Sequence, residues 1–283
     1  MTAPLEFQLV EVKSTRLITP HMARITFVGA DLHRFVAVSP DQQVKLFFSR
    51  TDDAPEVPPR PADGDILTWH RAYLAMPDDI RPWLRAYTIR AHRPDVAEID
   101  IDFVLHGDEG PASAWAGSAQ PGQILGMLGP SPSHYATIGE HDWQLLVGDE
   151  TALPAIASNI EALPEGARAM AYIEVANADE EQDLATSAGI RVRWIHRDDQ
   201  GPDALLDALR ASDLPDGRAF AWIAGEAGMV REVRRHLVNE RGIDKKAIAF
   251  TGYWRRDLTQ DAAPTPDDVA DVQEAQAAAV GVQ

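Results

Sequence analysis

The 283-residue sequence contains no cysteine, and this absence removes several kinds of chemistry. Without thiols the chain cannot form disulfides, hold an iron–sulfur cluster through thiolates, or use a cysteine nucleophile or a cysteine-based zinc site. If this protein transfers electrons, a bound organic cofactor must therefore carry them.

Positive charge is also scarce, and no segment has the form of a leader or a membrane span. Lys and Arg total 26 against 44 Asp and Glu, a formal net charge of -18. So acidic a protein repels phosphate, which argues against nucleic-acid and anionic-membrane partners. The N-terminus lacks a basic segment followed by an apolar one, and no apolar run approaches bilayer length. We therefore expect a soluble cytoplasmic protein; its oligomeric state stays open.

The first half of the chain has the pattern of antiparallel β-structure. In Glu98–Leu105 apolar residues alternate with three acids, which is the period of a half-buried strand. Five further strands are expected at Phe7–Val12, Ala23–Val28, Val44–Phe48, Tyr87–Ala91 and Gln123–Leu128. Six such segments favour a closed or nearly closed barrel. The Pro-, Asp- and Arg-rich stretch Ser49–Pro82 predicts a long surface loop.

After about Ile138 the pattern changes to short, nearly continuous apolar runs that alternate with helical segments. The expected strands are Trp143–Val147, Ala169–Val175, Val192–His196, Ala219–Ala224 and Ala247–Thr251. The expected helices are Leu153–Leu163, Asp203–Ala211 and Met229–Glu240. This alternation predicts an open parallel sheet with a nucleotide site at the carboxyl ends of its strands. Asp257–Gln283 carries six acids and no base, and it holds an Ala-rich segment that could be helical. We expect a frayed or loosely docked tail.

The segment RAYTIR, at positions 85 to 90, carries residue types that suit a flavin. On a strand Arg85, Tyr87 and Ile89 share one face, while Thr88 and Arg90 share the other. A flavin site needs an aromatic plane, a hydrogen-bonding group near the reactive ring nitrogen and cations for the pyrophosphate. The same segment also fits an amphipathic edge strand with two surface arginines.

Three turns before expected helices have the form of anion sites. In HGDEGPASAWA, at positions 106 to 116, Gly110 and Pro111 end the extended run and Ser113 can cap a helix whose free N–H groups attract anions. GDETALP, from position 148, and GEAG, from position 225, open the helices after the first and fourth buried strands, where a dinucleotide lies in parallel α/β domains. GDETALP lacks the GxGxxG pattern, and its acids Asp149 and Glu150 could either point away while backbone amides bind the ligand or contact ribose hydroxyls. The other two segments also fit ordinary turns.

Eight segments, in this order, carry a resemblance that spans about Phe7 to Arg255. They are LITPHMARITFVGADL (Leu17–Leu32), VKLFF (Val44–Phe48), RAYTIR, DFVLHGDEGPASAWA (Asp102–Ala116), PGQILGMLGP (Pro121–Pro130), GDETALPAI (Gly148–Ile156), AGE (Ala224–Glu226) and GYWR (Gly252–Arg255). Together they resemble the siderophore-interacting protein family, the flavin-dependent ferric-siderophore reductases of the ferredoxin–NADP reductase-like superfamily.

The resemblance implies a fold class of β-barrel plus α/β. An antiparallel FAD-binding barrel over residues 1–138 would be followed by a parallel-sheet NAD(P)H-binding domain over 139–257 and an acidic tail over 258–283. The implied cofactor is FAD, the implied electron donor is NADPH or NADH, and the implied substrate is a ferric siderophore. The nine histidines show no close-paired ligand pattern, so we expect no protein-bound metal.

The resemblance also implies roles for particular residues. Arg85 would contact the FAD phosphate region, Tyr87 would pack on the isoalloxazine and Thr88 would bond near its N5, which makes Tyr87 and Thr88 the catalytic candidates; Ile89 and Arg90 complete the motif. The candidates for the pyrophosphate and adenine side of FAD are His106, Gly110, Pro111, Ala112 and Ser113. The candidates for the nicotinamide nucleotide are Asp149, Glu150, Thr151, Ala152, Gly225 and Glu226.

Basic residues surround the ferric chelate in similar proteins, and here Lys45 and Arg255 occupy matching segments. They would attract an anionic chelate, although Lys45 also fits a snorkelling strand lysine and Arg255 a salt bridge to a tail acid. Family members often carry a base after the Gly-Pro that closes the barrel, where this chain has Ser131-Pro132-Ser133. A third basic contact would then come from Arg256 or His134.

Several choices stay open at this point. A related flavin reductase with another acceptor, or a siderophore-binding protein without activity, would keep much of the same pattern. The nucleotide is also undecided, because Asp179 and Glu180 would repel a 2′-phosphate whereas Arg197 could bind one. In the usual glycine position after the GYWR segment this chain has Asp257, which bears on substrate preference.

Overall fold

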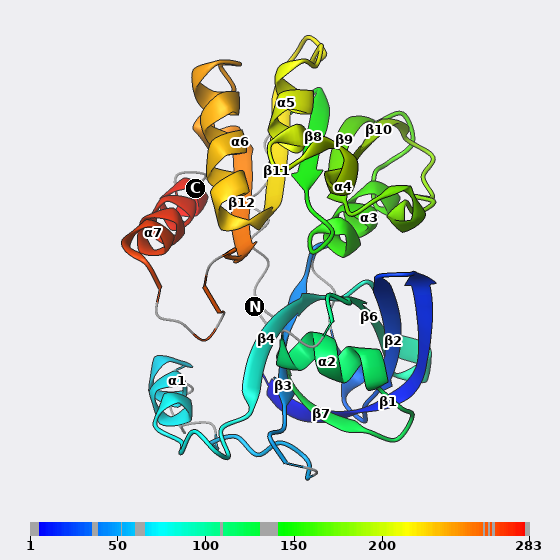
Figure 1. Cartoon of the computed structure of the whole chain (residues 1–283), viewed down its shortest axis with the longest axis vertical. Coiled ribbons are helices and arrows are strands. Elements are labelled where there is room, and N and C mark those ends of the chain that lie inside the picture. Colours follow the sequence, from blue (N-terminus) through cyan, green and yellow to red (C-terminus); the bar gives the residue numbers. More distant parts are fainter. Residues whose placement is uncertain are drawn as a thin grey trace. The chain divides into compact units, whose positions relative to one another are not determined.

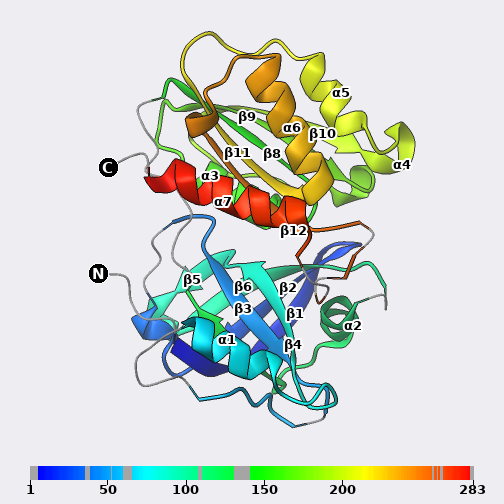
Figure 2. The ribbon, with the colours of Figure 1, turned by 90° about the vertical axis from the view of Figure 1, so that its left-hand side faces the viewer.

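The chain folds into two units (Figures 1 and 2), and each is described by itself. The computed structural model describes residues 6–35, 39–51, 53–59, 66–107, 110–130, 141–256, 258–259, 261 and 264–280. Unit 1 comprises Met1–Ala37 and Gln42–Pro132, and unit 2 comprises Val38–Asp41 and Ser133–Gln283. The boundary expected at 138 lies outside the described residues. Within the described part of the chain, no helix is long and apolar enough to cross a bilayer.

Unit 1 is an antiparallel sheet that closes on itself. Its strands are β1 (Glu6–Thr19), β2 (Met22–Val28), β3 (Gln43–Phe48), β4 (Trp83–Thr88), β5 (Ala91–Arg93), β6 (Glu98–Val104) and β7 (Ile124–Gly129). The seven-stranded order is β4-β3-β7-β1-β2-β6-β5, so the two edge strands β4 and β5 are consecutive in sequence. Only Ile89 and Arg90 separate them, and the Arg90 N–H donates to the Asp100 carbonyl of β6 at 2.8 Å. The barrel prediction is thereby confirmed.

The barrel core is filled by the alternating apolar residues that the sequence pattern indicates. Ile99, Ile101 and Phe103 of β6 are fully buried, and they pack with inward residues of β2, β3 and β7. Helix α2 (Pro111–Ser118) contributes Trp115, whose ring lies 6.3 Å from that of Phe27 and 5.9 Å from that of Phe103. Large buried aromatics of this kind contribute much of the free energy of folding of a small barrel.

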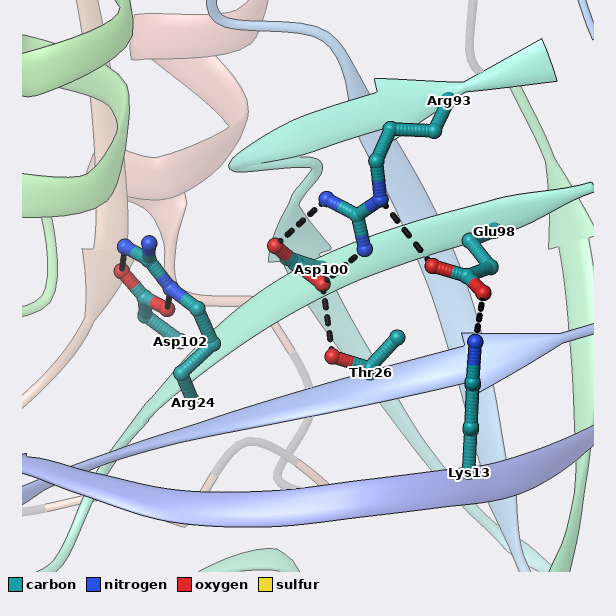
Figure 3. A network of polar contacts seen from close by, with 7 residues as sticks. All are labelled: Lys13, Arg24, Thr26, Arg93, Glu98, Asp100 and Asp102. Atoms are coloured by element: carbon teal, nitrogen blue, oxygen red, sulfur yellow. Dashed lines mark hydrogen bonds and ion pairs between the residues drawn. The ribbon is translucent and has the colours of Figure 1, made fainter. Parts of the chain in front are cut away.

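The acids on the opposite face of β6 are buried as well, and each is paired with a base. Figure 3 shows the network formed by Lys13, Arg24, Thr26, Arg93, Glu98, Asp100 and Asp102. Arg24 donates two hydrogen bonds to Asp102, at 2.6 and 2.7 Å, and Arg93 donates two to Asp100, at 2.6 and 2.8 Å. Burial raises the pKa of Asp100, but the hydrogen bonds from Arg93 and Thr26 outweigh it and hold that pKa below its usual value. These acids therefore stabilise the sheet rather than facing a ligand.

Two details of the sequence prediction for this unit are wrong. The expected strand Tyr87–Ala91 spans the break between β4 and β5, because the chain must turn there to close the barrel. The expected loop Ser49–Pro82 contains helix α1 (Ile66–Leu74). Trp69 and Tyr73, one helical turn apart, both pack edge-on against Phe47 at 6.0 Å, which gives this short helix an apolar face to bury. Unit 1 also has short 3₁₀ helices at Leu32–Arg34, before α1, and at Pro94–Val96, after it.

Unit 2 is built on a five-stranded parallel sheet of order β10-β9-β8-β11-β12. The strands are β8 (Trp143–Gly148), β9 (Arg168–Val175), β10 (Gly189–His196), β11 (Ala219–Glu226) and β12 (Ile248–Trp254). The helices are α3 (Leu153–Glu161), α4 (Arg197–Gln200), α5 (Ala204–Arg210) and α6 (Ala227–Asn239), with 3₁₀ turns at Ala178–Glu180 and Lys245–Ala247. Strand order reverses between β8 and β11, and in such sheets ligands bind at the carboxyl ends next to this reversal.

The acidic tail forms a helix, as its Ala-rich segment allowed, but it contacts the rest of unit 2 through ion pairs instead of being frayed or loosely docked. Helix α7 (Pro266–Val280) follows Thr265, whose hydroxyl accepts from the Asp268 N–H while Asp268 accepts from the Thr265 N–H, a reciprocal cap. Arg231 of α6 donates to Asp268 at 2.9 Å and to Asp271 at 2.8 Å. Among the side chains of α7 that the structure describes, Asp268 and Asp271 thus hold the helix through ion pairs.

Candidate functional site

The RAYTIR residues lie at the end of β4, where the barrel closes. The Tyr87 ring is partly buried against Phe103, at 4.4 Å between centroids, and burial raises the pKa of its phenol, which keeps the group neutral. Thr88 is buried beside it. Arg85 donates to the Leu84 carbonyl at 2.8 Å. Tyr87 therefore offers a fixed aromatic surface, and Arg85 a cation two residues away on the same strand.

The other two residues of the motif have structural partners. Ile89 belongs to the barrel core, and its N–H donates to the Gln42 carbonyl at 2.9 Å. The Arg90 side chain lies 4.0 Å from Asp102, and its N–H helps to close the barrel. Both residues hold the strand break that positions Tyr87 and Thr88.

The turn before α2 is organised by Ser113, although not as a helix cap. Gly110 is the N-cap and Pro111 the first helical residue, so the prediction that Ser113 caps the helix is wrong. The Ser113 hydroxyl instead accepts from the His106 N–H at 3.0 Å and donates to the Gly107 carbonyl at 3.0 Å. The first amides of α2, beginning at Ala112, have no acceptor within the helix, which suits an anion.

In unit 2 the buried carboxylate of Asp149 joins the carboxyl ends of three strands. It accepts from the Thr151 N–H at 2.9 Å and hydroxyl at 2.6 Å, just after β8. It also accepts from the Glu226 N–H of β11 at 2.8 Å and from the Trp254 indole of β12 at 2.8 Å. The side chain expected to face a nucleotide is thus engaged with the protein itself, and Trp254, which the sequence reading did not select, is one of its partners.

Two glycines let the strand ends and the helices come close together at the reversal of strand order. A Cβ atom at Gly148 would lie 2.7 Å from the Ala224 carbonyl oxygen and 2.6 Å from the Ala152 Cβ. Gly225 has φ +135° and a Cβ there would lie 2.6 Å from an Asp149 oxygen, so both conformation and space require glycine. Glu226 then caps α6 by accepting from the Met229 N–H at 2.8 Å. Both glycines are buried, and the amides of Thr151 and Glu226 beside them donate to Asp149.

Glu150 pairs with Arg197 across the same edge of the sheet. Arg197 donates two hydrogen bonds to the Glu150 carboxylate, at 2.8 and 3.0 Å, and lies 3.4 Å from Glu174 at the end of β9. Burial raises the pKa values of Glu150 and Glu174, while Arg197 opposes that shift. The two carboxylates in turn raise the pKa of Arg197, the first through a hydrogen bond from its guanidinium. The arginine is therefore held by acids of two neighbouring strand ends.

The two substrate candidates lie in different surroundings. Lys45 is on β3, and desolvation lowers the pKa of its ammonium group. His70 of α1 lies close enough that, after burial, the charge of Lys45 is the second cause that lowers its pKa. No pattern in the sequence indicated this neighbour, since His70 falls in the segment expected to be a loop.

Arg255, the other substrate candidate, is ion-paired to the tail helix. It donates to Asp268 at 2.9 Å and to the Thr259 carbonyl at 3.0 Å. Burial raises the pKa of Asp268, but hydrogen bonds from Thr265 and the charge of Arg255 outweigh it and lower that pKa. This is the salt bridge to a tail acid that the sequence left open as the alternative. Arg256 is exposed, whereas His134 and Ser131-Pro132-Ser133 lie outside the described residues.

A closed flavin-type barrel followed by a doubly wound sheet defines the ferredoxin–NADP reductase-like class. The ferredoxin reductase of carbazole 1,9a-dioxygenase shares this fold with a TM-score of 0.63 at 17% identity, over 89% of this chain and 70% of that one. Residues 11–134 match the model of the siderophore-interacting FAD-binding domain, and residues 141–257 match that of the siderophore-interacting protein.

Relatives over nearly the whole chain carry related names. The ferric vibriobactin reductase ViuB of Vibrio cholerae is 30% identical over 90% of this chain and 92% of its own length. The NADPH-dependent ferric-chelate reductase of Escherichia coli is 31% identical over 88% and 93%. The crystal structure of a siderophore utilization protein from T. fusca superposes with a TM-score of 0.74 at 36% identity, over 93% of this chain and 97% of that one. The chain belongs to the siderophore-interacting protein family.

Proposed function

We propose that this protein is an FAD-containing, NAD(P)H-dependent ferric-siderophore reductase. The observation that carries the proposal is the order of two matching halves: an FAD-binding barrel over residues 11–134 and an α/β unit over 141–257 whose strand order reverses between β8 and β11. Reductases need this combination because one half must hold the flavin and the other the nucleotide that reduces it.

The residues of the barrel fit the flavin that the family implies. Tyr87 is held by its packing on Phe103 and would supply an aromatic plane, and the next residue, the buried Thr88, would supply a hydroxyl. Arg85 would supply a positive charge, and the first amides of α2, which have no partner within the helix, would supply donors for a pyrophosphate. FAD bound there would accept a hydride from the nucleotide and release single electrons to ferric iron.

The side chains and backbone amides of the protein would then serve to position the flavin and the nucleotide. Thr88 would orient the reactive edge through a hydrogen bond, and Tyr87 would fix the ring against the barrel. The turns at Gly148 and Gly225 would present backbone amides to the nucleotide. No residue needs to ligate the iron, because reduction to Fe(II) lowers its charge and so weakens its attraction to the oxygen donors of the siderophore.

We propose that Lys45 and Arg255 favour the approach of an anionic ferric chelate to an otherwise acidic protein. Alanine at either position should raise KM for such a chelate by about three- to tenfold, since a charge at the edge of a binding site acts mainly on encounter and affinity. Turnover with a neutral dye should stay unchanged. The readout is formation of Fe(II) with a ferrous-specific chromogen, measured beside oxidation of the nucleotide.

Because Arg255 pairs with Asp268, a variant at Asp268 should have the opposite effect on KM. Asp268→Asn removes the charge that neutralises Arg255 and should lower the same KM. Arg235, an exposed arginine of α6, is the matched control, and its replacement by Ala should change neither acceptor. Equal losses of turnover on the chelate and on the dye would contradict a role for Lys45 and Arg255 in substrate binding.

A further inference from the structure

The edge of the sheet where the adenosine half of a dinucleotide lies is set by β8 and β9. Gly148, the last residue of β8, pairs in register with Ile173 of β9, so Glu174 is the next residue along that neighbouring strand. In doubly wound dinucleotide-binding sheets, an acid at the end of the second strand accepts a hydrogen bond from the ribose 2′-hydroxyl, whereas a nearby arginine takes up a 2′-phosphate. Both kinds of residue are present here, as Glu174 and Arg197.

The arginine is already engaged. Glu150 accepts from both terminal nitrogens of Arg197 in a two-pronged pair, the strongest arrangement that a guanidinium makes with one carboxylate. Glu174 approaches the same guanidinium at 3.4 Å. For Arg197 to bind a phosphate, it would have to give up Glu150 and leave two half-buried carboxylates facing the incoming anion.

The carboxylates around this ion pair also oppose the binding of a 2′-phosphate. Asp149 and the buried Glu180 lie close enough to raise the pKa of Glu150, after the larger effect of burial. Arg197 thus contacts two carboxylates, Glu150 and Glu174, and two more, Asp149 and Glu180, lie near Glu150. A 2′-phosphate would meet net negative charge, while a 2′-hydroxyl would meet carboxylate acceptors.

We infer that this protein uses NADH in preference to NADPH, and that Glu150 and Glu174 set the preference by holding Arg197 and by accepting from the 2′-hydroxyl. The inference rests on the proposed function and names its electron donor. Glu150 acts as a specificity-determining residue through Arg197, and Glu174 acts directly on the ribose.

The test compares kcat/KM for NADH and NADPH with one ferric chelate. The wild-type ratio should favour NADH by about tenfold or more, because like charges that face each other at a binding site are strongly disfavoured. Glu150→Gln should lower this ratio about tenfold, through a smaller KM for NADPH, by freeing one arm of the guanidinium. Adding Arg197→Met to Glu150→Gln should remove that gain, which separates release of the arginine from a mere loss of negative charge.

Glu181→Gln is the matched control, because Glu181 lies near the same edge but pairs with His196 and not with Arg197. The ratio of this variant should equal that of the wild type. A second readout needs no variant: 5′-AMP should inhibit the wild-type enzyme against NADH more strongly than adenosine 2′,5′-bisphosphate does.

The possible results distinguish failure of the NADH inference from failure of the proposed reductase function. A wild-type enzyme that prefers NADPH, or that binds the bisphosphate more tightly than 5′-AMP, overturns the NADH inference and leaves the reductase proposal standing. An unchanged ratio in Glu150→Gln with the wild-type preference intact overturns the role of Glu150. Failure of both nucleotides to reduce the bound flavin contradicts the proposed function itself.

Discussion

Replacing Asp149 by Ala is expected to destabilise unit 2 by about 3–5 kcal/mol, the range for removing one member of a buried charged network. The substitution would leave the Trp254 indole, the Glu226 amide and both Thr151 donors without the acceptor of their partly buried hydrogen bonds. The denaturant midpoint should fall, and the amides of Thr151 and Glu226 should lose protection in hydrogen exchange.

Asp149→Asn tests whether the charge and the second acceptor oxygen of the carboxylate matter beyond the volume of the side chain. An amide keeps one acceptor oxygen but turns its own N–H₂ group towards donors, so a large part of the loss should remain. Asp213→Ala, at an exposed carboxylate of the same unit, is the control and should change stability by less than about 0.5 kcal/mol. A stable Asp149→Ala protein that has lost only nucleotide binding would instead restore the role that the sequence suggested, a side chain turned towards the ligand.

Replacing Arg85 by Ala is expected to weaken FAD binding about 10- to 100-fold, the effect of losing one charge-assisted hydrogen bond to a phosphate. The guanidinium lies on β4 two residues before Tyr87, and its loss removes no part of the barrel core. Quenching of flavin fluorescence during titration of the apoprotein gives the dissociation constant. Tyr87→Phe should bind FAD almost as well as the wild type, because the ring and not the phenol is expected to meet the flavin.

Arg16→Ala is the control for Arg85, since Arg16 is an exposed arginine on β1 of the same barrel. Equal affinity for FAD in Arg85→Ala and Arg16→Ala would remove Arg85 from the cofactor site. The amides of α2 would then be left as the candidates for binding the pyrophosphate.

Local patterns in the sequence were sufficient to predict most strands and helices. The alternation in β6 indicated a strand with an apolar face, and the continuous runs from Trp143 onward indicated buried parallel strands. These patterns depend only on neighbours in the chain. The break between β4 and β5 was missed because barrel closure, a property of all seven strands, imposes it. Helix α1 was missed because proline-rich flanks obscured the spacing of Trp69 and Tyr73.

Local patterns predicted the partners of the candidate site residues even less well than they predicted the fold. The sequence identified Asp149 and Glu150 as facing a nucleotide, yet their actual partners are distant in the chain: Glu226 and Trp254 lie 77 and 105 residues beyond Asp149, and Arg197 lies 47 beyond Glu150. The Thr265–Asp268 cap of α7 was a local signal that could have been used. Which arginines the helix then contacts depends on the packing of α6 and was not visible in the sequence.

An anaerobic absorbance titration tests the central claim, that this chain carries electrons from a nicotinamide nucleotide through FAD to chelated iron. The account predicts a yellow protein that bleaches on addition of NADH and regains its colour on addition of a ferric siderophore, with a ferrous-specific dye reporting Fe(II) in step. A preparation that shows no flavin band after FAD is supplied, or a bleached flavin that the ferric chelate leaves reduced, would contradict it.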